Sequence, residues 1–154
     1  MLLKKTTIVE IISALFVILF IYTGLNKLLD YDTFRFQMGR SPYLQNKSGM
    51  VAATLPGGEL LVALALIVPR TRLAGLYASF FLMSLFTGYV AIMLSFSYYL
   101  PCSCGGILQA LSWRQHLVFN SLFTILSVIG VLLQSQTGQR SSIPLFNKPK
   151  IQQA

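Results

Sequence analysis

Long apolar blocks alternate with short polar segments along the chain. Each block is about 20 residues long, which is the length that an α-helix needs to cross a hydrocarbon core about 30 Å thick. Blocks of this kind fold as helices, because lipid offers no hydrogen-bond partners to backbone N–H and C=O groups. The pattern therefore predicts an all-α polytopic membrane protein, a four-transmembrane-helix bundle with spans at about residues 8–29, 50–68, 73–97 and 117–133.

The two ends of the chain differ from the spans. Lys4 and Lys5 precede the first apolar block, but no A-x-A-like cleavage site follows it, so we expect a retained helix and not a signal peptide. Residues 134–154 are polar, contain two prolines and show no helical period. We therefore expect a membrane domain over residues 1–133 and a disordered cytoplasmic tail over residues 134–154.

The composition supports a membrane protein and argues against a nucleic-acid-binding one. Hydrophobic residues make up 55% of the chain and charged residues only 10%, whereas a soluble domain carries about 25% charged residues. The net charge is +8, but the basic residues are scattered between the apolar blocks in runs of two at most. They form no phosphate-tracking patch, and basic residues that flank membrane helices explain the charge. The expected partner is the lipid bilayer, with no nucleic acid.

The positions of the basic residues also predict the orientation. Four spans place both termini on one side of the membrane, and this side carries more Lys and Arg than the other, with Arg70 and Arg72 in a short connection. Because short cytoplasmic segments are rich in Lys and Arg, we expect both termini in the cytoplasm. The protein would lie in a bacterial inner membrane, with the loop of residues 98–114 on the periplasmic face.

That loop contains both cysteines of the chain, in the sequence Pro-Cys-Ser-Cys-Gly-Gly of residues 101–106. A disulfide between Cys102 and Cys104 requires a tight turn and would be strained. Strained, exposed disulfides exchange readily with other thiols, and the periplasm is oxidising. These features favour a redox-active pair. Two buried structural thiols are one alternative, and a metal site is another, although two thiolates and His116 provide fewer than four ligands.

Two polar residues of the predicted spans are candidates for proton transfer. Glu59 lies near the middle of the second span, where an ionisable group is costly and suggests a function. Its structural alternative is a bond to a neighbouring helix through Lys27, Asn26 or Asn120. His116, at the start of the last span, is a candidate base for a thiol, or else an ordinary hydrogen-bonding residue at a helix end.

Several of these residues form a pattern together. It comprises Gly24-Leu25-Asn26-Lys27-Leu28 at the end of the first span, Phe34, Pro56, Glu59, Arg72, Cys102-x-Cys104-Gly105 and Asn120. Over about residues 8–133, the pattern resembles the MauE/DoxX family of four-helix membrane proteins, and within it the methylamine-utilisation branch MauE. The chain departs from that family at Ser103 and Gly105-Gly106, where the usual motif has Cys-Gly-Cys-Phe-Gly character.

The resemblance implies a redox-associated role. MauE is linked to maturation of the disulfide-rich small subunit of periplasmic methylamine dehydrogenase, and its relatives often accompany thioredoxin-like proteins. Cys102 and Cys104 would then exchange with a periplasmic thioredoxin-like or cysteine-containing partner, while Glu59 and Lys27 match intramembrane polar positions of the family. By analogy with other four-helix redox proteins, the electrons would pass to a membrane quinone. No other cofactor is evident.

The leading hypothesis is therefore an inner-membrane protein that supports thiol–disulfide redox chemistry or maturation of periplasmic proteins, with the activity of a thiol–disulfide oxidoreductase. The first alternative is a non-enzymatic membrane scaffold or accessory subunit, in which the cysteines brace one loop. The second is a small-molecule carrier with Glu59 as its proton site, but four helices leave little room for a pathway.

Overall fold

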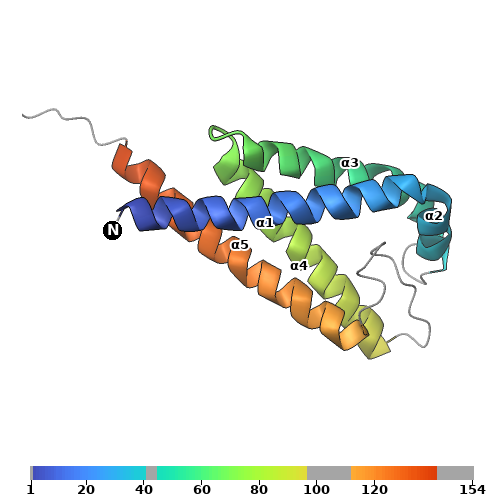
Figure 1. Cartoon of the computed structure of the whole chain (residues 1–154). Coiled ribbons are helices and arrows are strands. Elements are labelled where there is room, and N and C mark those ends of the chain that lie inside the picture. Colours follow the sequence, from blue (N-terminus) through green and yellow to red (C-terminus); the bar gives the residue numbers. More distant parts are fainter. Residues whose placement is uncertain (1, 41–44, 97–111, 142–154) are drawn as a thin grey trace, which may run out of the picture.

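The computed structural model describes residues 2–40, 45–96 and 112–141 (Figure 1). Within them, four long helices are long and apolar enough to cross a membrane, and this confirms the predicted all-α class with four membrane spans. The elements are α1 (Leu2–Leu29), α2 (Tyr31–Gly39), the 3-10 helix η1 (Gln45–Lys47), α3 (Ser48–Ile67), α4 (Arg72–Phe96) and α5 (Trp113–Ser141).

The long helices pack as two hairpins that contact each other. α1 packs against α3 and α4 packs against α5, while α1 also contacts α5 and α3 also contacts α4. The start of α1 and the end of α5 lie at one end of the bundle, where Lys5 Nζ donates to Gln136 Oε1 at 3.0 Å. Figure 1 shows α2, the end of α4 and the start of α5 toward the opposite end, which we call the α2 end.

The core between the hairpins is apolar and partly aromatic. Phe16 is fully buried on α1; its ring stacks on Phe20 at 5.7 Å between centroids and meets the edge of Phe123 on α5 at 5.3 Å. The outer faces are apolar too: Ile18 is 67% exposed and Leu61 69% exposed. Apolar side chains on both faces are typical of a helix that packs inward against protein and outward against lipid.

The segment between the first two spans is not only a loop, because it contains α2. Phe34 and Met38 are one helical turn apart and both are buried, packed with Ala52 of α3. Two apolar side chains at this spacing give a short helix one buried stripe. The hydrophobic pattern did not predict α2, because so short a stripe is a weak periodic signal.

The last helix is longer than the predicted span of residues 117–133. α5 begins at Trp113 and continues to Ser141, so residues 134–141, which the sequence placed in the polar tail, are helical. Proline first appears in this region at Pro144, and no proline therefore stops the helix where the apolar block ends. The rest of the predicted tail, residues 142–154, lies outside the described residues.

Candidate functional site

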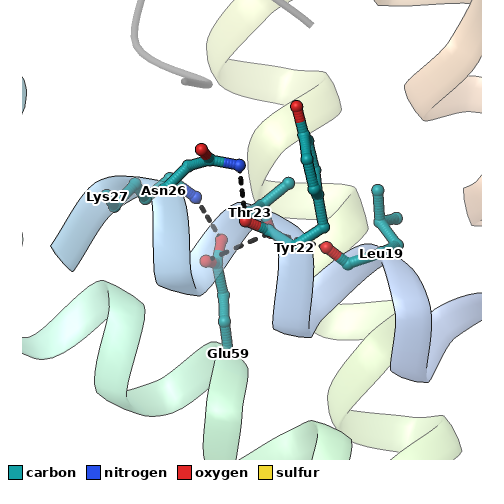
Figure 2. A network of polar contacts seen from close by, with 6 residues as sticks. All are labelled: Leu19, Tyr22, Thr23, Asn26, Lys27 and Glu59. Atoms are coloured by element: carbon teal, nitrogen blue, oxygen red, sulfur yellow. Dashed lines mark hydrogen bonds and ion pairs between the residues drawn. The ribbon is translucent and has the colours of Figure 1, made fainter. Parts of the chain in front are cut away.

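The main polar feature of the described bundle is an ion pair between two membrane-spanning helices. Glu59 of α3 is 0% exposed and Lys27 of α1 is 4% exposed. Lys27 Nζ donates to Glu59 Oε1, and Thr23 Oγ1 lies 3.3 Å from the second carboxylate oxygen, Oε2 (Figure 2). Both oxygens of Glu59 therefore face donors from α1.

The sequence of α1 explains how these donors reach Glu59. Thr23 and Lys27 are four residues apart and so lie on the same face of the helix. Between them, Gly24 allows α1 to approach α3, since a Cβ at this position would lie 3.3 Å from Leu60 Cδ2 and 3.4 Å from the carbonyl oxygen of Pro56. A small residue at such a crossing lets two membrane helices pack closely.

Two aromatic rings also lie near the Lys27 ammonium group. Its Nζ lies 5.8 Å from the ring centroid of Phe34 on α2 and 5.3 Å from that of Phe86 on α4. The face of an aromatic ring attracts a cation at this range. Lys27 therefore connects four helices, because it belongs to α1, pairs with Glu59 on α3 and contacts rings of α2 and α4.

The Thr23 hydroxyl offers a matched test of this network. Its single O–H is shared between Glu59 Oε2 at 3.3 Å and the carbonyl oxygen of Leu19 at 2.9 Å, whereas the Thr54 hydroxyl on α3 donates to the carbonyl oxygen of Met50 at 2.9 Å. We expect Thr23→Val to lower the free energy of unfolding by about 1 kcal/mol more than Thr54→Val, because only Thr23 solvates a buried charge. Unfolding in mixed detergent micelles, followed by circular dichroism, measures the difference; equal losses would mean that Thr23 does not stabilise Glu59.

Of the three residues predicted as structural partners of Glu59, the structure shows Lys27. Asn26 Nδ2 donates instead to the carbonyl oxygen of Tyr22 at 2.8 Å, one turn back along α1 (Figure 2). Asn120 Nδ2 has no hydrogen-bond partner among the described residues. His116, the second proton-transfer candidate, is not bonded to Glu59, whose side-chain partners are Lys27 and Thr23.

His116 and Asn120 lie on the buried face of α5, with exposed fractions of 6% and 5%. The helix starts at Trp113 because Ser112 and Gln115 cap it reciprocally: Gln115 N donates to Ser112 Oγ at 3.4 Å, and Ser112 N donates to Gln115 Oε1 at 2.9 Å. This is a capping box. It places His116 in the first turn of α5, at the α2 end of the bundle.

The cysteine pair falls between α4 and α5. Cys102 and Cys104 lie outside the described residues, whereas Phe96, the last residue of α4, and Trp113, the first of α5, are described. Among residues 2–40, 45–96 and 112–141, no three His, Cys, Asp or Glu side chains are grouped so that they could hold a metal ion.

The four spans and the buried ion pair define a small polytopic membrane protein in which an intramembrane charge pair joins α1 and α3. A family model described as "Methylamine utilisation protein MauE" matches residues 5–133, and the chain belongs to this family. The match confirms the resemblance seen in the sequence. No curated protein and no solved structure matches the chain.

Proposed function

We propose that this MauE-family protein catalyses thiol–disulfide exchange at the periplasmic face of a bacterial inner membrane, through Cys102 and Cys104, in support of the maturation of periplasmic proteins. The observation that carries the proposal is the position of the two cysteines, the only two of the chain, in a Cys-x-Cys motif between two membrane spans. The membership of the MauE family supports a role in methylamine utilisation or a related maturation pathway.

The exchange begins with the Cys102–Cys104 disulfide and a reduced dithiol partner. A partner thiolate attacks one sulfur of the pair, forms a mixed disulfide and releases the other cysteine as a thiolate. The second partner thiol then loses its proton and attacks the mixed disulfide. The partner leaves with a new disulfide, and Cys102 and Cys104 are left as two thiols. Two electrons and two protons have passed from the partner to the pair.

A membrane quinone is the acceptor that regenerates the disulfide. It takes two electrons and two protons from Cys102 and Cys104 and becomes the quinol, so the cycle is balanced. The membrane is a natural source of this acceptor, because a quinone is lipid-soluble and the protein spans the bilayer by four helices. Glu59 and His116 remain candidates for carrying protons between the thiols and the acceptor.

Trapping of the mixed disulfide tests the proposal. The variants Cys102→Ser and Cys104→Ser, in membranes, are first treated with 5,5′-dithiobis(2-nitrobenzoic acid), which converts their one cysteine to a mixed disulfide. A thioredoxin variant that keeps only its attacking cysteine then displaces the thionitrobenzoate, and the variant that keeps the attacked sulfur should accumulate a stable adduct, visible on a non-reducing gel and lost after reduction. The wild-type chain, oxidised to the Cys102–Cys104 disulfide, should be reduced by thioredoxin that has both cysteines and appear with two free thiols after alkylation with a maleimide.

The competing function is a membrane scaffold or accessory subunit. The ion pair that connects four helices favours it, since such a contact builds a defined bundle without any chemistry. If neither single-cysteine variant forms an adduct, and both thiols stay reduced when quinone is added to the wild-type chain, exchange is excluded. The cysteines would then serve only to brace their loop.

A further inference from the structure

Asn120 is a buried hydrogen-bond donor without an acceptor in the described part of the chain. Its side chain lies on the inner face of α5, with only 5% of the residue exposed, and Nδ2 has no partner. An unsatisfied buried donor costs about 1–3 kcal/mol, and the hydrocarbon region supplies no water to reduce that cost. Buried polar groups nearly always have a partner, so this one calls for an acceptor from outside the described chain.

Asn26 shows that an asparagine in a helix of this bundle can satisfy itself. Its Nδ2 reaches back one turn to the carbonyl oxygen of Tyr22 at 2.8 Å. Asn120 makes no such bond to the preceding turn. The only other unpartnered buried side-chain atom of the described residues is Ser13 Oγ. A serine hydroxyl can rotate to bond the preceding turn, as Ser79 does with Gly75 at 2.7 Å, so Ser13 is a weaker sign of a ligand.

Asn120 has both polar and aromatic neighbours along α5. One turn further along α5, Thr124 Oγ1 donates to the backbone carbonyl of Asn120 at 2.8 Å and lies 3.2 Å from Thr87 Oγ1 on α4. Phe119 directly precedes Asn120 in the sequence and Phe123 follows it by three residues, and their ring centroids lie 4.6 Å apart. A free amide N–H on a helix that also carries this pair of rings suits a planar molecule with a carbonyl oxygen.

The position of Asn120 along the helix agrees with a ligand dissolved in the membrane. It follows Trp113, the first residue of α5, by seven residues, which corresponds to about 10 Å along the helix axis. The segment with Cys102 and Cys104 directly precedes α5 in the chain. A lipid-soluble acceptor bound at Asn120 would therefore contact the helix that directly follows the cysteine-bearing segment in the chain.

We propose that Asn120 Nδ2 donates a hydrogen bond to a carbonyl oxygen of a membrane quinone, and that this face of α5 is the binding site for the quinone. The inference rests on the proposed function, in which a quinone reoxidises the cysteine pair. It adds a binding residue and its contact: the amide N–H of Asn120 is the donor and the quinone carbonyl is the acceptor.

The single tryptophan of the chain provides a readout that does not depend on activity. Quinones quench tryptophan fluorescence at short range, and Trp113 is the only tryptophan, two turns from Asn120 on the same helix. Menadione is titrated into the full-length protein in lipid nanodiscs. We expect saturable quenching for the wild-type chain and an apparent Kd raised roughly tenfold in Asn120→Leu, which keeps the size of the side chain but removes the donor.

Asn26→Leu is the matched control, because it removes a helical asparagine whose amide is already bonded. It should leave the Kd for menadione unchanged. If Asn120→Leu fails to fold, as judged by far-ultraviolet circular dichroism, Asn120→Ala replaces it with the same expectation. Quenching that rises linearly without saturation in the wild-type chain would overturn the site. So would an unchanged Kd in both Asn120 variants, which would leave a trapped water as the partner of the amide.

The same titration in Cys102→Ser/Cys104→Ser separates this proposal from the proposed exchange reaction. The hydrogen bond to the quinone does not involve a thiol, so the double variant should bind menadione with the wild-type Kd. Failure of the thioredoxin trapping with retained saturable quenching would exclude exchange but keep the quinone site. Successful trapping without saturable quenching would support exchange but exclude the quinone site.

Discussion

Replacement of Glu59 by leucine is expected to lower the free energy of unfolding of the bundle by about 3–5 kcal/mol. The variant leaves the Lys27 ammonium, which is 4% exposed, without its carboxylate partner. The rings of Phe34 and Phe86 lie near this ammonium but offer no full negative charge, so they cannot compensate for the loss. Titration with sodium dodecyl sulfate in mixed micelles, followed by circular dichroism, measures the effect.

The double variant Lys27→Met/Glu59→Leu identifies the cause. When both charges are removed and similar volumes are kept, most of the lost stability should return, because burial of an unpaired charge is the main cost. Glu10→Gln is the control at an exposed pair: Glu10 is 59% exposed and its Oε1 lies 4.0 Å from Arg72 Nη1, so its loss should stay below about 1 kcal/mol. Additive losses in the double variant would contradict a direct Lys27–Glu59 interaction.

A buried pair of this kind also limits how α1 and α3 can pack. The two outer surfaces of these helices are apolar and would tolerate rotation or sliding in lipid. Displacement of either helix separates Lys27 from Glu59 and exposes both charges to hydrocarbon. We expect the pair to select one register, while apolar contacts such as that between Gly24 and Leu60 supply close packing in that register.

The number and approximate bounds of the spans could be predicted from the sequence because the signal is the length of each apolar block. Where packing decides the structure, the sequence was less informative. The short helix α2 depends on burial of Phe34 and Met38 against Ala52, and this contact is defined only once α3 is in place. The continuation of α5 to Ser141 crosses from apolar to polar residues, where hydrophobicity no longer marks a helix.

The candidate site was likewise predictable only in part, because its partners depend on packing. Glu59 stood out because a carboxylate interrupts an apolar block, but three residues competed as its partner. A sequence gives the depth of each residue in the membrane and not the rotation of its helix, so Lys27 could not be chosen over Asn26 or Asn120. Thr23 was missed because a hydroxyl in a membrane helix ordinarily bonds the preceding turn, and it does so here at Leu19 while also facing Glu59.

At the other end of the bundle from α2, Gly75→Leu is expected to lower the free energy of unfolding by about 3 kcal/mol. Gly75 is buried near the start of α4, and a Cβ there would lie 3.0 Å from the backbone nitrogen of Leu66 and from its Cγ and Cδ2 atoms. Leu66 is itself only 1% exposed, near the end of α3. Because backbone is among the atoms contacted, a rotamer change cannot make room, and the two helices must move apart.

Gly88→Leu is the matched control, since Gly88 belongs to the same helix and a Cβ there meets nothing within 4 Å. Both substitutions replace glycine with a strong helix former, so a difference between them in the same detergent titration reports the contact between α3 and α4 and not helix propensity. A loss of stability in Gly75→Leu alone would show that close packing beside the short α3–α4 connection holds that half of the bundle. Equal behaviour of the two variants would mean that α3 and α4 separate there at little cost, so that close packing at Gly75 does not hold the two helices together.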